Sequence, residues 1–98
     1  MTLRFFEDAA AEVERERQWY LERSPKAMAV FLREVDGALF SIVEAPRRWP
    51  EYLAGTRRYV LPTFPFSIIY FEDGSDVLIV AVAHERRRPG YWRGRLPE

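Results

Sequence analysis

The chain has 98 residues, of which fifteen are basic and fifteen acidic, so its formal net charge is zero. Its length supports one domain with one core, and its 48% hydrophobic and 15% aromatic content excludes wholesale disorder. The absence of cysteine excludes disulfides and thiolate zinc sites, and a single histidine excludes a multi-histidine metal site. We therefore expect one domain over residues 1–98, with no metal and no cofactor.

Residues 2–6 are short and apolar, and they predict an opening strand. Asp8 is the expected N-cap of a helix over residues 8–23, in which apolar side chains recur at helical spacing. Arg17 interrupts this apolar stripe, and we expect it to pair with Glu14 one turn earlier.

A second helix is predicted over residues 25–44. Ser24 is a preferred N-cap residue and Pro25 a preferred first helical residue. Pro46 ends the helix because it disfavours helical geometry at the residue before it. The break between the helices is too short for a linker, so the two should form an antiparallel hairpin.

After a loop over residues 47–55, in which Trp49 should cap the core, three strands are predicted at residues 57–61, 66–71 and 76–83. The dipeptide Asp73-Gly74 indicates a hairpin between the last two strands. Their nearly continuous apolar character is typical of central strands covered on both faces. The order β-α-α-β-β-β predicts an α+β domain: an N-terminal strand, a helical hairpin, a three-stranded antiparallel meander and a basic aromatic C-terminal tail.

No targeting or membrane segment is expected. An acidic residue follows the N-terminus too soon for a signal peptide, and the longest apolar run, residues 77–83, is far shorter than the roughly 20 residues of a membrane helix. We therefore expect a soluble protein of the bacterial cytoplasm with no membrane partner.

Charge is distributed unevenly along the chain. Residues 1–24 carry six acids and four arginines, whereas residues 84–95 carry five arginines and one glutamate. Arginine suits bidentate recognition of phosphate or carboxylate, although a GC-rich genome would also favour arginine codons. Any basic surface must therefore be local and built near the C-terminus.

The tail HERRRPGYWRGR, residues 84–95, combines one histidine, an arginine cluster and two adjacent aromatic residues. Arginines neutralise phosphates, aromatic rings stack on bases, and histidine moves protons near neutral pH. A protein that holds RNA and polarises a 2′-hydroxyl needs these groups. In the alternative interpretation, Tyr91 and Trp92 pack on the sheet edge, His84 is a hydrogen-bonded structural residue, and the arginines are solvated or bind an acidic protein.

Arg57 and Arg58 open the second predicted strand. Because side chains alternate across a strand, one should face the helices or the core rim and the other the open sheet face, where it could join the C-terminal cluster. Salt bridges to the acidic first helix are the alternative. No paired carboxylates, phosphate-binding glycine loop or Ser-His-Asp arrangement is recognisable.

The motifs also occur in a recognisable order: Trp19-Tyr20, Pro46, Arg57-Arg58, FPFSIIY at residues 64–70, AVAH at residues 81–84 and RRPGYWRGR at residues 87–95. This ordered combination resembles the RelE/ParE superfamily of type II toxin–antitoxin toxins, often described as plasmid stabilisation proteins. The resemblance covers almost the whole chain. It implies a helical hairpin packed on an antiparallel sheet.

The resemblance further implies a toxin that arrests growth when free and is neutralised by a cognate antitoxin. The toxin would then contact operator DNA only indirectly, through the antitoxin. RelE-like members are mRNA interferases that cleave mRNA on the ribosome without a metal, and ParE-like members are inhibitors of DNA gyrase. Both targets stay open, so the chain is either a metal-independent endoribonuclease or not an enzyme. The further alternative is a non-toxic, degenerate toxin that serves as an antitoxin-binding or autoregulatory module.

For a ribonuclease, the resemblance implies that Arg58 and Arg87 hold the scissile phosphate and that His84 or Tyr91 moves the proton. Ser67 stands where RelE-like nucleases tend to carry an arginine, which weakens the nuclease hypothesis without establishing gyrase inhibition. Trp92 would support base stacking. The residues expected to bind the target or RNA are Arg57, Arg86, Arg88, Trp92, Arg93 and Arg95.

Overall fold

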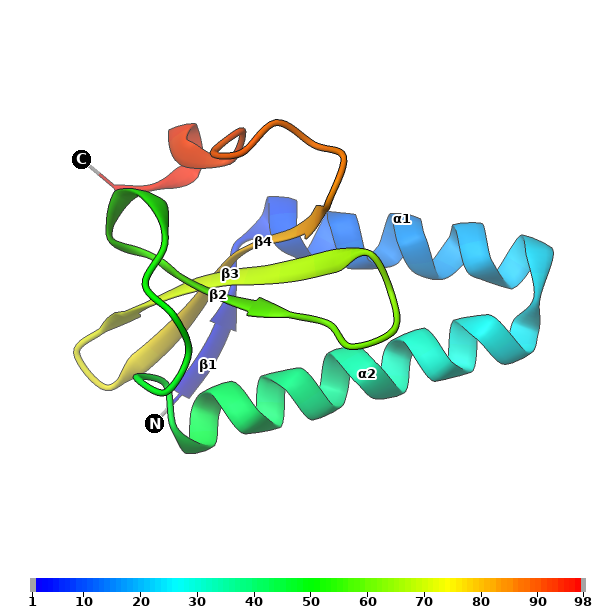
Figure 1. Ribbon diagram of the computed structural model, residues 1–98, viewed down its shortest axis with the longest axis horizontal. Coiled ribbons are helices and arrows are strands. Elements are labelled where there is room, and N and C mark those ends of the chain that lie inside the picture. The colour runs from blue at the N-terminus through cyan, green and yellow to red at the C-terminus, as the bar shows by residue number, and fades with distance from the viewer. Residues whose placement is uncertain (1, 98) are drawn as a thin grey trace.

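The computed structural model describes residues 2–97 and confirms the predicted order of elements (Figure 1). Strand β1 is followed by helices α1 and α2, and strands β2, β3 and β4 complete the sheet. The bounds are β1 Thr2–Phe5, α1 Glu7–Arg23, α2 Pro25–Glu44, β2 Arg57–Val60, β3 Phe66–Asp73 and β4 Asp76–His84, with short 3-10 helices at Leu53–Gly55 and Arg93–Arg95. The predicted helices and strands differ from these bounds only at element ends, and the two 3-10 helices lie in the predicted loop and tail.

The predicted N-cap of α1 is wrong. The helix begins at Glu7, and Phe6 occupies the capping position without a side-chain cap. The Phe6 amide donates to the Ile79 carbonyl at 2.9 Å, so the strand-like pairing with β4 continues up to the residue that enters the helix. Asp8 lies instead in the first helical turn, where its charge favours the positive end of the helix dipole.

The predicted hairpin between the helices is confirmed in detail. The Ser24 hydroxyl accepts a hydrogen bond from the Ala27 amide at 3.1 Å, and Pro25 is the first residue of α2. On α1, the Arg17 guanidinium donates to both carboxylate oxygens of Glu14, at 2.6 and 2.8 Å. Arg17 therefore interrupts the apolar stripe as a surface ion pair.

The four strands form one sheet in the order β1-β4-β3-β2. Strands β2, β3 and β4 are the predicted antiparallel meander, and β1 pairs in parallel with β4. The register between β3 and β4 shifts at Val80, because Ile69 faces Ala81 and Tyr70 faces Ile79. This bulge explains why consecutive residues, Val80 and Ala81, both belong to the same cluster on one face of the sheet.

Hydrophobic residues cover both faces of the sheet. On one face, α2 contributes Phe31, Val35, Ala38 and Ile42 to a core with Phe66, Ile68 and Tyr70 of β3. The other face carries a smaller cluster in which Trp92 of the C-terminal segment, residues 85–97, covers Ile69, Val80 and Ala81. Figure 1 shows α2 on one side of the sheet and the C-terminal segment, which is coloured orange to red, on the other. No helix within residues 2–97 is long and apolar enough to cross a membrane.

Candidate target-binding site

The C-terminal segment leaves β4 through a tight turn that His84 stabilises. The Arg87 amide donates to the His84 carbonyl at 3.0 Å, and the Arg86 amide donates to His84 Nδ1, also at 3.0 Å. The imidazole packs edge-on against Phe66, with 5.0 Å between the ring centroids. His84 thus makes the structural hydrogen bond of the alternative interpretation, which leaves its predicted catalytic role untested.

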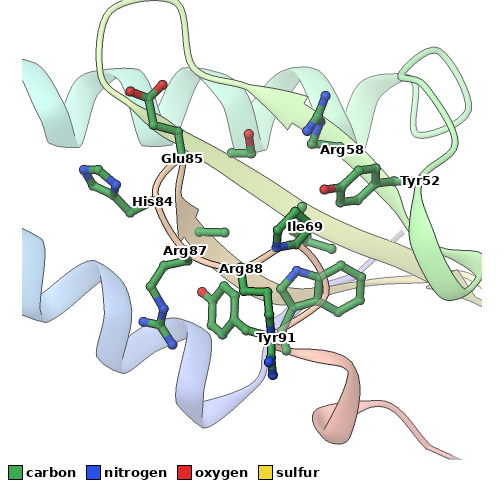
Figure 2. Close-up of a pocket in the computed structure, with 12 residues that line it drawn as sticks. Tyr52, Arg58, Ile69, His84, Glu85, Arg87, Arg88 and Tyr91 are labelled. Atoms are coloured by element: carbon green, nitrogen blue, oxygen red, sulfur yellow. The ribbon is translucent and has the colours of Figure 1, made fainter.

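A cavity lies between this segment and the sheet (Figure 2). Its lining includes Arg58 of β2 and Arg87 and Arg88 of the C-terminal segment, together with the buried side chains of Ile69 and Trp92. His84 and Tyr91 also line it, so the four residues predicted to be catalytic surround one cavity. The arrangement offers guanidinium groups to an anion over a partly apolar floor.

Two arginines of this cavity are stacked on tyrosine rings. The guanidinium carbon of Arg58 lies 4.5 Å from the ring centroid of Tyr52, and that of Arg87 lies 3.8 Å from the ring centroid of Tyr91. Such cation–π contacts contribute about 0.5–1 kcal/mol at exposed sites. They restrict the arginines without neutralising them, so both remain able to bind an anion.

The expected alternation of Arg57 and Arg58 is found. Arg58 is exposed on the cavity side, whereas the Arg57 guanidinium turns away and donates to the Trp49 carbonyl at 2.7 Å. Arg57 also lies 3.6 Å from the Glu51 carboxylate. Its guanidinium therefore holds the preceding loop and is not part of the cavity.

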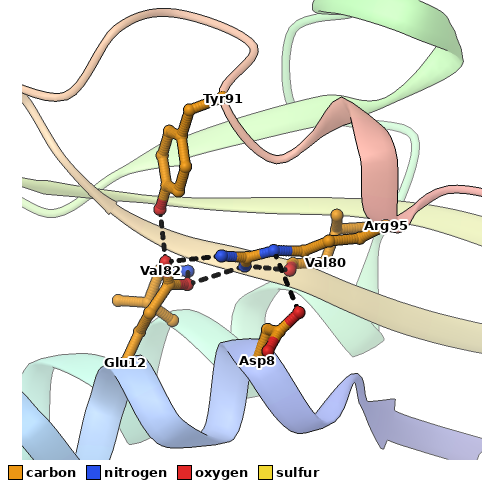
Figure 3. A network of polar contacts seen from close by, with 6 residues as sticks. All are labelled: Asp8, Glu12, Val80, Val82, Tyr91 and Arg95. Atoms are coloured by element: carbon orange, nitrogen blue, oxygen red, sulfur yellow. Dashed lines mark hydrogen bonds and ion pairs between the residues drawn. The ribbon is translucent and has the colours of Figure 1, made fainter.

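A buried carboxylate connects the C-terminal segment to α1 (Figure 3). Glu12 is 4% exposed, and its Oε1 and Oε2 each accept a hydrogen bond from the Arg95 guanidinium at 3.0 Å. The Tyr91 hydroxyl donates to Oε2, and the Val82 amide donates to Oε1 at 3.0 Å. Arg95 also donates to the Val80 carbonyl at 3.0 Å and lies 3.5 Å from the Asp8 carboxylate.

These contacts determine the protonation states of Tyr91 and Arg95. Burial and the hydrogen bond to Glu12 raise the pKa of the Tyr91 hydroxyl well above its usual value. Burial works to lower the pKa of Arg95, but the hydrogen bond and charge of Glu12 outweigh it and raise that pKa. At neutral pH, Tyr91 is therefore a neutral phenol and Arg95 a cation.

Besides Arg57, two further residues expected to bind the target are engaged inside the protein. Trp92 is 1% exposed and forms the centre of the second core, so its ring is not available to stack on a base in this conformation. The Arg95 guanidinium is bound to Glu12 inside the protein and is not free to bind RNA or another target. Both residues fix the segment that carries the exposed arginines.

Five arginines of β2 and the C-terminal segment offer an exposed basic surface. This surface, which we call the arginine face, is made of exposed side chains that pair with no carboxylate of residues 2–97: Arg58, Arg86, Arg87, Arg88 and Arg93. Within residues 2–97, no three His, Cys, Asp or Glu side chains lie close enough together to bind a metal ion.

Glu12 is the important residue that the sequence-based reasoning did not identify. It lies three residues after Ala9 and one before Val13, on the side of α1 that faces the sheet. In the sequence, the sign that Glu12 is important is that an acidic residue lies on the apolar face of the predicted helix. Its partners are about seventy to eighty positions away, so only the tertiary structure identifies them.

The helical hairpin on one sheet face and the arginine-rich segment on the other define a toxin of the RelE/ParE superfamily. Within it, the chain belongs to the ParE family: the family described as ParE toxin of type II toxin-antitoxin system, parDE, matches residues 3–89. The match ends before Tyr91, Trp92 and Arg95.

A comparison with solved structures supports the same fold. A chain of the structure titled "Chromosomal ParDE TA system from P. aeruginosa" superposes with a TM-score of 0.75 at 17% sequence identity. The alignment covers 86% of this chain and 95% of that one. No curated protein sequence matches the chain.

Proposed function

We propose that this chain is the toxin of a type II toxin–antitoxin pair, that it arrests growth when free by inhibiting DNA gyrase, and that a cognate antitoxin neutralises it. Membership of the ParE family supports the gyrase target over the ribosome. The proposed place of action is the cytoplasm, where gyrase works. Contact with operator DNA would occur only through the antitoxin.

The internal hydrogen bonds of the Tyr91 hydroxyl and of His84 Nδ1 are the observation that carries this proposal. General acid–base catalysis needs a group within hydrogen-bond reach of the substrate proton. The Tyr91 hydroxyl donates to the Glu12 carboxylate, and His84 Nδ1 accepts from the Arg86 amide. With Ser67 in place of an arginine, the cavity has groups suited to binding an anion, and the Tyr91 hydroxyl and His84 Nδ1 already have partners within the protein, which favours a binding toxin over a nuclease.

The arginine face supports the proposed antitoxin contact. Its five exposed cations would attract an acidic C-terminal segment of an antitoxin, and such complementarity chiefly raises the association rate. An antitoxin bound there would also shield the same arginines from the target. Neutralisation would then be direct occlusion.

A ribonuclease is the second candidate, because Arg58, His84, Arg87 and Tyr91 line one cavity. In that case Arg58 and Arg87 would hold the scissile phosphate. The proton would move through His84 Nε2, or through the Tyr91 hydroxyl once it exchanged its hydrogen bond to Glu12 for one to RNA. Alanine at His84, Arg87 and Tyr91 would then abolish mRNA cleavage while antitoxin binding stays measurable.

Induced expression without antitoxin, followed by two parallel assays, tests these functions. We expect growth arrest, a DNA-damage response, inhibition of gyrase supercoiling by micromolar toxin, and no ribosome-dependent mRNA cleavage. Cleavage without an effect on supercoiling would instead establish the ribonuclease. Normal growth of cells that accumulate the folded protein would favour the non-toxic antitoxin-binding module.

A further inference from the structure

The carboxylate of Glu12 is fully occupied although it lies outside the cavity. A carboxylate offers roughly four lone-pair sites, and Glu12 accepts four hydrogen bonds, from Val82, Tyr91 and twice from Arg95. These donors come from β4 and from the C-terminal segment, whereas Glu12 comes from α1 (Figure 3). One side chain therefore joins three parts of the chain.

Stability alone does not account for this arrangement. Burying a charge pair is costly, and well-packed apolar residues often stabilise a protein as well or better. What the pair adds is direction, because the forked guanidinium of Arg95 meets both carboxylate oxygens at 3.0 Å. The C-terminal segment is thus held in one orientation and not merely attached.

This orientation reaches the cavity through Tyr91. The hydroxyl end of Tyr91 is fixed by Glu12, and its ring carries the Arg87 guanidinium at 3.8 Å. Arg87 and Tyr91 line the cavity, with Arg58 on a different side of it (Figure 2). Moving the Tyr91 ring would therefore move the platform on which Arg87 is held.

We propose that Glu12 is a positioning residue of the target-binding site: through Tyr91 it holds Arg87 in place against Arg58, and through Arg95 it holds the segment that carries the other exposed arginines. The effect on toxicity rests on the proposed gyrase function. The effect on the Arg87 side chain does not.

The test compares Glu12→Gln with two matched controls. Glu7→Gln makes the same change at an exposed residue of the same helix. Val35→Ala weakens the core on the other sheet face, and it controls for a general loss of stability. The measurements are the thermal midpoint, the toxin concentration that halves gyrase supercoiling, and the Nε–Hε NMR resonance of Arg87.

We expect Glu12→Gln to raise the half-inhibitory concentration at least tenfold and to shift or broaden the Arg87 resonance. Glu7→Gln should match the wild type in potency and in the Arg87 resonance, and it should lower the thermal midpoint only slightly, because Glu7 lies in the first turn of α1. Val35→Ala should lower the thermal midpoint while keeping the potency and the resonance of the wild type at temperatures where it is folded. Wild-type potency in Glu12→Gln, or an equal loss in Val35→Ala at an equal thermal midpoint, would overturn the proposal.

Tyr91→Phe keeps the test decisive if Glu12→Gln does not fold. It removes only the hydroxyl that donates to Glu12 and retains the ring under Arg87. We expect a partial loss of potency and a shifted Arg87 resonance. The proposal would be contradicted if both stayed as in the wild type. If the wild-type toxin leaves gyrase unaffected, the gyrase function fails, and the Arg87 resonance alone then decides the positioning role.

Discussion

Tyr70 is buried between the sheet and the loop that follows α2, and its hydroxyl donates to the Pro46 carbonyl at 2.6 Å. Burial raises the pKa of Tyr70 to about 12. An unfolded tyrosine titrates near 10, so the stability due to the neutral phenol is complete below about pH 10 and is lost as the pH rises toward 12. The loss of stability is on the order of 3 kcal/mol.

We therefore predict that the free energy of unfolding falls between pH 10 and 12, and that Tyr70→Phe reduces this fall. Tyr91 adds to the effect, since its pKa is also raised, so the variant should retain part of the pH dependence. Urea unfolding of the wild type and the variant at several pH values measures this free energy. An identical pH dependence in Tyr70→Phe and the wild type would contradict the burial argument.

Gly90 is the residue at which the C-terminal segment needs a left-handed backbone, with φ at 79°. A Cβ there would also lie 3.2 Å from Arg93 Nε. We predict that Gly90→Ala lowers the free energy of unfolding by about 1–2 kcal/mol, the usual cost of this conformation for other residues. Gly94→Ala is the control, because a Cβ at Gly94 meets no atom within 4 Å, and equal losses in both variants would be inconsistent with backbone strain at Gly90.

At the scale of elements, the start of α2 depends on one side-chain hydrogen bond. Removing the Ser24 hydroxyl in Ser24→Ala should cost about 1 kcal/mol, because the Ala27 amide loses its acceptor. Ser24→Asp retains an acceptor and should stay close to the wild type. Thermal unfolding of the two variants checks this, and equal thermal midpoints would show that the cap contributes nothing.

The elements themselves could be predicted because local rules govern them. Ser24 and Pro25 signal a helix start in any context, and the apolar runs of β3 and β4 are long enough to indicate central strands. Asp8 fails as an N-cap because the pairing of Phe6 with β4, a tertiary contact, moves the helix start. The parallel pairing of β1 with β4 is likewise decided by the whole fold.

The candidate site was predictable only in part, for the same reason. Strand alternation correctly separates Arg57 from Arg58, and the clustering of arginines after β4 correctly locates the arginine face. Composition does not distinguish a free arginine from one that a distant carboxylate binds, as the contrast between Arg93 and Arg95 illustrates. Nor does it show that Trp92 is needed to cover Ile69 and Val80.

For the whole molecule, the zero net charge conceals a local excess of arginine: the C-terminal segment, which lies on the sheet face opposite α2, carries the exposed residues Arg86, Arg87, Arg88 and Arg93. We predict that charge reversal in Arg88→Glu slows association with the cognate antitoxin about tenfold at low salt and much less at high salt. Arg33→Glu on α2 is the control, since Arg33 is exposed but lies on the helical side. Stopped-flow association rates measure both, and equal slowing would place the antitoxin contact elsewhere.

The proposed function depends on what the free toxin does to DNA gyrase. The most direct measurement is the supercoiling of relaxed plasmid by purified DNA gyrase with increasing amounts of this chain. We predict inhibition at micromolar toxin, relieved when the cognate antitoxin is added. Unchanged supercoiling by folded toxin at those concentrations would contradict the proposal that gyrase is the target.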